Sequence, residues 1–145
     1  MALYILLAVF FVVLDRFLKF LAVNSYNSDQ FRIFGDFFQF NFIPNYNIAF
    51  SLPITGVFLN FVIISIIVIL LYELLFSEIK NEWPKATLLT FIIFGAISNM
   101  LDRLKYGFVI DYLDLKYFTV FNIADVMIVG GVLGMFFITI KSNKL

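Results

Sequence analysis

The sequence predicts an all-α membrane protein, with four transmembrane helices and a small β-sheet between the first two. Across 145 residues, 63% are hydrophobic and 14% are charged, whereas a water-soluble domain is nearer half apolar. Four apolar stretches approach the roughly 20 residues that a helix needs to cross the hydrocarbon core. Residues 38–42 instead alternate apolar and polar side chains, which is the period of a half-buried strand. We expect one integral membrane domain over residues 1–145.

The four expected helices have different boundaries and contents. They lie at about residues 3–23, 56–75, 86–101 and 121–140. Pro84 and Asp102 bound the third helix, and Asp15 and Asp102 are read as ending their spans. In the fourth helix Gly130 and Gly134 have the spacing of a small-residue face, which we expect to pack closely on another helix.

The first apolar stretch also has the length of a signal-peptide core. A cleaved signal peptide carries basic residues before that core and small residues at a cleavage site. Neither pattern is found around residues 1–23, so we expect the stretch to remain as the first helix. Three charged residues, Asp15, Arg16 and Lys19, lie in its second half. Ionisable groups at membrane depth are costly and usually functional.

Four spans would place both termini and residues 76–85 on one side of the membrane, and residues 24–55 and 102–120 on the other. Lys and Arg are equally frequent on the two sides, but two Lys in the last five residues favour a cytoplasmic tail. All three Glu lie at the middle loop, and all seven Asp lie toward the opposite side. Tyr, Phe and Asn dominate residues 24–50, which predicts an antiparallel sheet resting on the membrane interface. Residues 102–120 could lie beside it.

The chain has no Cys and no His. This composition excludes disulfides, cysteine nucleophiles, Ser-His triads and the common zinc sites. Lys plus Arg equals Asp plus Glu, so the charge suggests no nucleic-acid partner. Hydrolytic chemistry in this chain must therefore use Asp, Glu, Lys, Ser, Thr or Tyr.

Two pairs of polar residues have helical spacing. Asp15 and Lys19 share a helix face, where we expect a structural ion pair. Asn99 and Arg103 share a face of the third helix. Asp102 and Arg103 could pair or cap, or a buried Asn99 and Arg103 could equally hold the backbone carbonyl of a substrate.

Asp111 and Asp125 are fourteen residues apart. A short hairpin between them could return the chain and bring both carboxylates together at the membrane surface. Two adjacent carboxylates share a proton, so one can act as base and the other as acid without a metal. Acids also pair in purely structural networks, so the spacing alone leaves both readings open.

These segments together resemble the lipoprotein signal peptidases, also called signal peptidase II, over nearly the whole chain. Four stretches carry the resemblance: an Asp followed by Lys four residues later at 15–19, an Asn-x-x-x-Ala-Phe stretch at 45–50, the segment 95–112, and Phe-Asn-x-Ala-Asp at 121–125. Glycines usual in the family are replaced here by Asn47, Phe94 and Ser98. None of these positions is in the aspartate pair, so the replacements bear on substrate preference more than on activity.

The resemblance implies an aspartic endopeptidase whose catalytic residues are Asp111 and Asp125, with no cofactor and no metal. It implies substrate-binding roles for Asn45, Asn99, Arg103 and Asn122. The implied substrate is a prolipoprotein, cleaved just before its diacylglyceryl-modified Cys at the periplasmic face of a bacterial inner membrane. We expect a monomer that contacts membrane lipids and is inhibited by globomycin-type compounds. The rival functions are a non-enzymatic transporter or assembly subunit, and a lipid-modifying enzyme.

Overall fold

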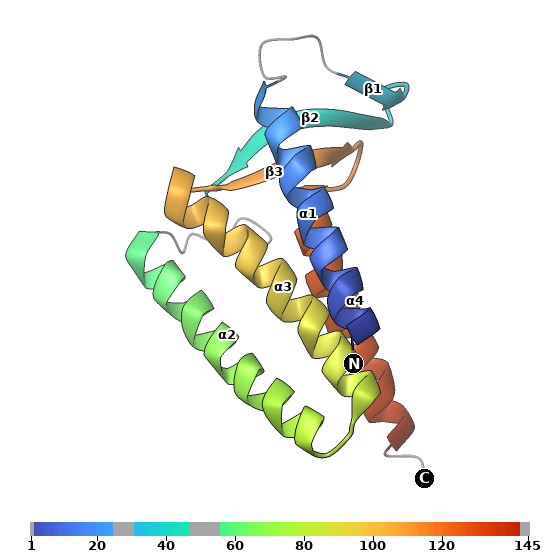
Figure 1. Ribbon diagram of the computed structural model, residues 1–145. Coiled ribbons are helices and arrows are strands. Elements are labelled where there is room, and N and C mark those ends of the chain that lie inside the picture. Colours follow the sequence, from blue (N-terminus) through green and yellow to red (C-terminus); the bar gives the residue numbers. More distant parts are fainter. Residues whose placement is uncertain (1, 25–30, 47–55, 143–145) are drawn as a thin grey trace.

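The computed structural model describes residues 2–24, 31–46 and 56–142, which form four helices and a four-stranded sheet (Figure 1). In chain order the elements are α1 (Ala2–Asn24), β1 (Phe31–Phe34), β2 (Phe38–Asn45), α2 (Gly56–Ile79), α3 (Trp83–Tyr106), β3 (Val109–Leu115), β4 (Val120–Phe121) and α4 (Ile123–Ser142). Helix α3 is central and contacts α1, α2 and α4, while α2 runs along its outer side (Figure 1).

Three of the described helices, α2, α3 and α4, are long and apolar enough to cross a membrane. A helix of 24 residues such as α2 spans about 36 Å at 1.5 Å per residue, somewhat more than a hydrocarbon core of about 30 Å. Helix α1 has a similar length, but every stretch of it that is long enough to cross a membrane includes the charged residues Asp15, Arg16 and Lys19. By length and composition, three of the four expected crossing helices are therefore supported. The crossing of the membrane by α1 stays a prediction.

The expected boundaries of the third helix are wrong at both ends. Helix α3 starts at Trp83, because Pro84 occupies its first turn, where a missing N–H is not needed. It continues to Tyr106 and ends at Gly107, whose left-handed backbone (φ 81°) lets its N–H bond to the Arg103 carbonyl. Asp102 therefore lies inside α3 rather than at its end, and Asp15 likewise lies within α1.

The remaining boundaries need smaller corrections. Helix α2 extends to Ile79, so most of the expected 76–85 loop is helical. Helix α4 starts at Ile123, because Phe121 belongs to strand β4.

The sheet lies across one end of the helices and is antiparallel in the order β1-β2-β3-β4 (Figure 1). Of the described strands, β1 and β2 lie between the first two helices. Strands β3 and β4 come from the segment after α3, which confirms that this segment lies beside the first. Ile110 and Tyr112 of β3 pack with Ala22 of α1 in a buried core beneath the sheet. That contact anchors the sheet on α1.

Close packing of α4 on α3 depends on glycines, although not on the expected pair. A Cβ atom on Gly131 would lie 2.4 Å from the Ile92 side chain, and one on Gly134 would lie 2.6 Å from Leu88. A Cβ atom on Gly130 would meet no atom within 4 Å. The prediction is therefore right for Gly134 and wrong for Gly130, because Gly131 and Gly134 are the glycines of α4 that pack against α3.

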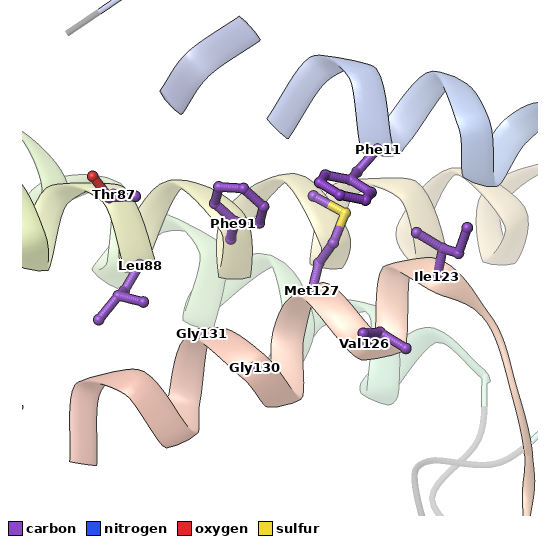
Figure 2. A pocket seen from close by; sticks show the side chains of 9 residues that line it. All are labelled: Phe11, Thr87, Leu88, Phe91, Ile123, Val126, Met127, Gly130 and Gly131. Atoms are coloured by element: carbon purple, nitrogen blue, oxygen red, sulfur yellow. The ribbon is translucent and has the colours of Figure 1, made fainter. Parts of the chain in front are cut away.

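Gly130 borders an apolar cavity of about 310 Å³ between α1, α3 and α4 (Figure 2). Phe11 projects from α1 into this space, and its ring lies 6.0 Å from that of Phe91 on α3. The lining from α4 includes Met127 and Val126. Among the described residues, no acidic one lines this cavity. The hydrogen-bonded acids Asp111 and Asp125 lie instead near the sheet, where β3 and the start of α4 meet.

Candidate active site

The start of α4 holds the first acid of the site. Asn122 precedes the helix, and its side-chain oxygen accepts a hydrogen bond from the backbone N–H of Asp125 at 2.8 Å. The Asp125 carboxylate accepts one in return from the backbone N–H of Asn122 at 3.2 Å. This reciprocal pair is a capping box, which satisfies two helix-end donors at once. It also holds the Asp125 carboxylate at the positive end of the α4 dipole.

The second acid, Asp111, lies on β3 and is 2% exposed. The side-chain amide of Asn122 donates to its Oδ1 at 2.7 Å. The side-chain amide of Asn45, at the end of β2, donates to its Oδ2 at 2.9 Å. Each oxygen of this buried carboxylate therefore has a neutral donor, and the two donors come from different parts of the chain.

The Asp125 carboxylate is held in the same manner. Its Oδ1 accepts from the Asn99 side-chain amide at 2.7 Å, while its Oδ2 accepts from the backbone of Asn122. Asn122 thus bonds to both Asp111 and Asp125. The β3–β4 hairpin does return the chain between them, as the spacing had suggested.

The electrostatics of Asp111 favour proton uptake near neutral pH. Burial, followed by the nearby negative charge of Asp125, raises the pKa of Asp111 from an ordinary 3.8 to about 7. Hydrogen bonds from Asn45 and Asn122 and the charge of Lys19 act in the opposite direction. A carboxyl group with a pKa near the working pH can both accept and release a proton there.

Arg103 lies in the last turn of α3 and is partly buried. Its guanidinium interacts electrostatically with the carboxylates of Asp111, Asp125 and Asp102. An arginine presents five N–H donors in a planar fork. A cation of this kind beside the two acids can bind a carbonyl or carboxylate group of a ligand.

A second cluster consists of ion pairs around Lys19, and it connects to Asp125 through Asn99. The Lys19 ammonium is 2.9 Å from Asp15, 2.8 Å from Asp102 and 2.8 Å from the side-chain oxygen of Asn99. Arg16 pairs with the other oxygen of Asp102 at 2.5 Å. Sequence reasoning had placed Asp15 with Lys19 but had not placed Asp102 or Arg16 with them.

Two further residues of this cluster were missed. Tyr112 donates its hydroxyl proton to Asp15 at 2.9 Å and accepts the backbone N–H of Ile123, at the start of α4, at 3.1 Å. Ser98 donates to the other oxygen of Asp15 at 2.7 Å. The i,i+4 spacing of Ser98 and Asp102 was a signal for a shared face; nothing in the sequence indicated Tyr112. Asn47 lies outside the described residues.

Comparisons with known proteins show the family of the chain. The family model described as Signal peptidase (SPase) II matches residues 7–141. Lipoprotein signal peptidases of Caldicellulosiruptor bescii and Moorella thermoacetica are 34% and 33% identical, over 90% of this chain and 86% and 87% of their own lengths. That of Enterococcus faecalis is 32% identical over 97% of this chain and 89% of its own.

Solved structures agree as well. A bacterial membrane enzyme solved by the in meso method at 2.3 Å resolution superposes with a TM-score of 0.83 and 25% identity, covering 99% of this chain and 90% of the other. A second, at 1.9 Å resolution, gives a TM-score of 0.79 and 26% identity, covering 97% of this chain and 94% of the other. The family match spans nearly all of the residues that build the helices, the sheet and the acid cluster. The chain therefore belongs to the signal peptidase II family.

Proposed function

We propose that this protein is an aspartic endopeptidase that removes the signal peptide from lipidated prolipoproteins, with Asp111 and Asp125 as its catalytic pair. One observation carries the proposal: both carboxylates are hydrogen-bonded to Asn122. The burial of Asp111, which raises its pKa to about 7, supports it. Family membership supplies the substrate class, a lipoprotein precursor. The cleaved bond is the one just before the diacylglyceryl-modified Cys.

The proposed reaction needs one proton shared between two acids. One carboxylate takes a proton from water as the water oxygen attacks the scissile carbonyl carbon. The protonated partner donates to the carbonyl oxygen, and a tetrahedral intermediate forms. Proton transfer to the nitrogen then lets the C–N bond break, which releases the signal peptide and a new N-terminal Cys. The chain has no His that could replace either acid.

The hydrogen bonds refine the roles expected for the polar neighbours. The side-chain amides of Asn45, Asn99 and Asn122 each donate to one of the two carboxylates. We assign these asparagines first to holding the acids in place, with their remaining hydrogen-bonding capacity available to the substrate. Arg103 is the group that we assign to a substrate carbonyl. No cofactor takes part.

Four membrane crossings are part of the proposal, with both termini cytoplasmic and the site at the periplasmic face of a bacterial inner membrane. Burial of the charges supports a crossing by α1, because Lys19 and Asp15 are 1% and 0% exposed. The outward-facing side chains of α1 include the large apolar groups Phe10, Val13, Phe17 and Phe20. With Asp15 and Lys19 paired inside the bundle, α1 faces outward mostly with apolar groups. Its remaining cation, Arg16, is 32% exposed and pairs with Asp102. We propose a single-domain monomer that globomycin-type compounds inhibit.

The test uses purified protein in detergent and a prolipoprotein with and without the diacylglyceryl group. We expect release of the signal peptide from the lipidated precursor by the wild-type protein and none by Asp111→Asn. Asp114→Asn, three residues along the same strand, is the matched control and should retain activity. Intact precursor after incubation with folded wild-type protein would contradict the proposal and favour a non-enzymatic membrane subunit. Modification of lipid without peptide release would favour a lipid-modifying enzyme.

A further inference from the structure

Lys19 does more than neutralise buried acids. Its ammonium is 1% exposed and has three hydrogen-bond acceptors: Asp15 Oδ2, Asp102 Oδ2 and Asn99 Oδ1. An ammonium has three donors and no acceptor. Two of them serve carboxylates on either side, and the third serves the neutral amide of Asn99. That third bond connects the ion-pair cluster to the acid pair.

The contact with Lys19 permits only one orientation of the Asn99 amide. Because the ammonium can only donate, the amide oxygen must face it, so the NH₂ group faces Asp125 Oδ1, 2.7 Å away. The Asn122 amide donates to the same Asn99 oxygen at 3.2 Å. Rotating the Asn99 amide by 180° would turn its NH₂ group toward the ammonium and its oxygen toward the carboxylate. The contact with Lys19 would then place donor against donor, and the contact with Asp125 would be unfavourable unless Asp125 carried a proton.

The Asn122 amide is oriented by a different kind of group. Its oxygen accepts the backbone N–H of Asp125 at 2.8 Å, so its NH₂ group must face Asp111. The backbone therefore ensures the donor to Asp111, whereas a side-chain cation ensures the donor to Asp125. Substitution can remove that cation while leaving Asn99 and both acids in the chain.

We propose that Lys19 is a positioning residue for the catalytic pair, acting through Asn99: it holds the amide in the orientation that donates to Asp125. The inference rests on the proposed peptidase function and assigns Lys19 no contact with the substrate. Without Lys19 the Asn99 oxygen keeps, of its described bonds, only the longer one from Asn122, so the amide turns over more readily and its donation to Asp125 is weakened.

Several other charged or titratable groups surround this contact and enter any pH dependence. Within the described residues they are Asp15 and Arg16 on α1, Asp102 and Arg103 on α3, Asp111 and Tyr112 on β3, and Asp125 on α4. The positive charge of Lys19 also lowers the pKa of Asp111 through space. Loss of Lys19 should therefore move the acid limb of the pH–rate profile to higher pH.

The first experiment compares Lys19→Met with Arg16→Met across pH, using a lipidated prolipoprotein in detergent. Both variants remove a cation from Asp102, but only Lys19 contacts Asn99. For Lys19→Met we expect a kcat loss of about ten- to a hundredfold, as for residues that orient metal ligands from outside, with KM nearly unchanged and the acid limb at higher pH. Arg16→Met should keep the wild-type acid limb.

The second experiment asks whether the effect passes through Asn99. Adding Lys19→Met to Asn99→Ala should lower kcat by less than about threefold, because residues that act as a unit are non-additive. If Lys19→Met does not fold, Lys19→Met with Asp102→Asn replaces it, compared with Asp102→Asn alone. Both the moved acid limb and the non-additivity are required. A wild-type acid limb in a folded variant, or the full loss repeated in the Asn99→Ala background, overturns the proposal. Failure of the wild-type protein to cleave would instead refute the peptidase function.

Discussion

Two pairs of aspartates lie near the sheet, three of them buried and Asp125 half-buried, and the pairs differ in what surrounds their charges. Asp15 and Asp102 are 0% exposed and pair with the cations Lys19 and Arg16. The hydrogen bonds that the structure shows to the Asp111 and Asp125 carboxylates come instead from asparagine amides and one backbone N–H. All four residues are aspartates, so the two pairs differ in the groups that contact their carboxylates: cations in one pair and mainly neutral amides in the other.

This difference indicates where the chain supports chemistry. A buried carboxylate that is paired with a cation keeps its charge and is committed to structure. A buried carboxylate that accepts hydrogen bonds from neutral amides and lies near another acid has a raised pKa, as Asp111 does, and can exchange protons at neutral pH. The predictions below alter one pair at a time.

The largest effect is expected from neutralising either member of the Asp111–Asp125 pair. Asp111→Asn or Asp125→Asn should lower kcat by at least about a thousandfold, and the double variant should be little worse, because the two acids act as one unit. Peptide release from a lipidated precursor measures it. Asp102 is unsuitable as the control because it holds Lys19; Asp114→Asn is the better one. Near wild-type cleavage by a correctly inserted Asp111→Asn would end the dyad assignment.

Arg103 interacts with Asp111 and Asp125 of one pair and with Asp102 of the other, so its replacement affects both pairs. Arg103→Lys keeps the charge but loses the planar fork, and we expect a loss of about ten- to a hundredfold in kcat/KM with normal membrane insertion. Kinetics with a lipidated precursor, beside a protease-accessibility assay for insertion, measure both. Full activity in Arg103→Lys would show that the charge alone suffices.

Removing compensation from the other pair should cost stability. Asp15→Asn leaves the buried Lys19 short of one counter-ion and weakens the bonds to Tyr112 and Ser98; breaking a buried pair costs about 3–5 kcal/mol. A lower Tm in detergent is the readout. Asp36→Asn is the matched control, since Asp36 also pairs with a cation four residues away, Arg32, but both are well exposed. Equal Tm changes in the two variants would contradict the contrast.

The smallest effect concerns the pH dependence of stability. Because the pKa of Asp111 rises to about 7 on folding, the folded protein holds a proton there that the unfolded chain releases. This contribution is complete below pH of about 4 and is lost as pH rises through 7. Asp111→Asn removes the dependence, so its Tm relative to wild type should be higher at pH 8 than at pH 5. An equal difference at both pH values would argue against a raised pKa.

Local sequence patterns predicted much of the fold because apolar length and alternation are properties of single segments. The C-terminal end of α3 was predicted too early because the charge of Asp102 suggested a boundary, whereas Lys19 and Arg16 on another helix compensate that charge. Gly107 was the available signal for the true end. The choice of Gly131 over Gly130 depends on which side of α4 meets α3, which spacing alone does not specify.

The sequence placed the candidate residues in motifs but could not show how they connect. Asn45, Asn99 and Asn122 looked alike as polar neighbours of the site. Their separate bonds to Asp111 and Asp125 follow from bringing β2, α3 and the start of α4 together. The role of Tyr112 could not be predicted either, because its hydrogen-bond partners Asp15 and Ile123 are 97 and 11 residues away in the sequence and are brought to it by the fold.

The capping box at the start of α4 restricts which sequences this protein can tolerate. Ser, Thr or Asp would begin a helix about as well as Asn. Only an amide, however, can accept the N–H of Asp125 and also donate to Asp111 and Asn99, as Asn122 does. Asp at position 122 would place a third carboxylate beside the pair, and Ser or Thr could not make all of these bonds with a single hydroxyl group. Engineering this chain for greater thermal stability should therefore leave residue 122 unchanged and look for stabilising substitutions at Gly130, where an added methyl group meets open space.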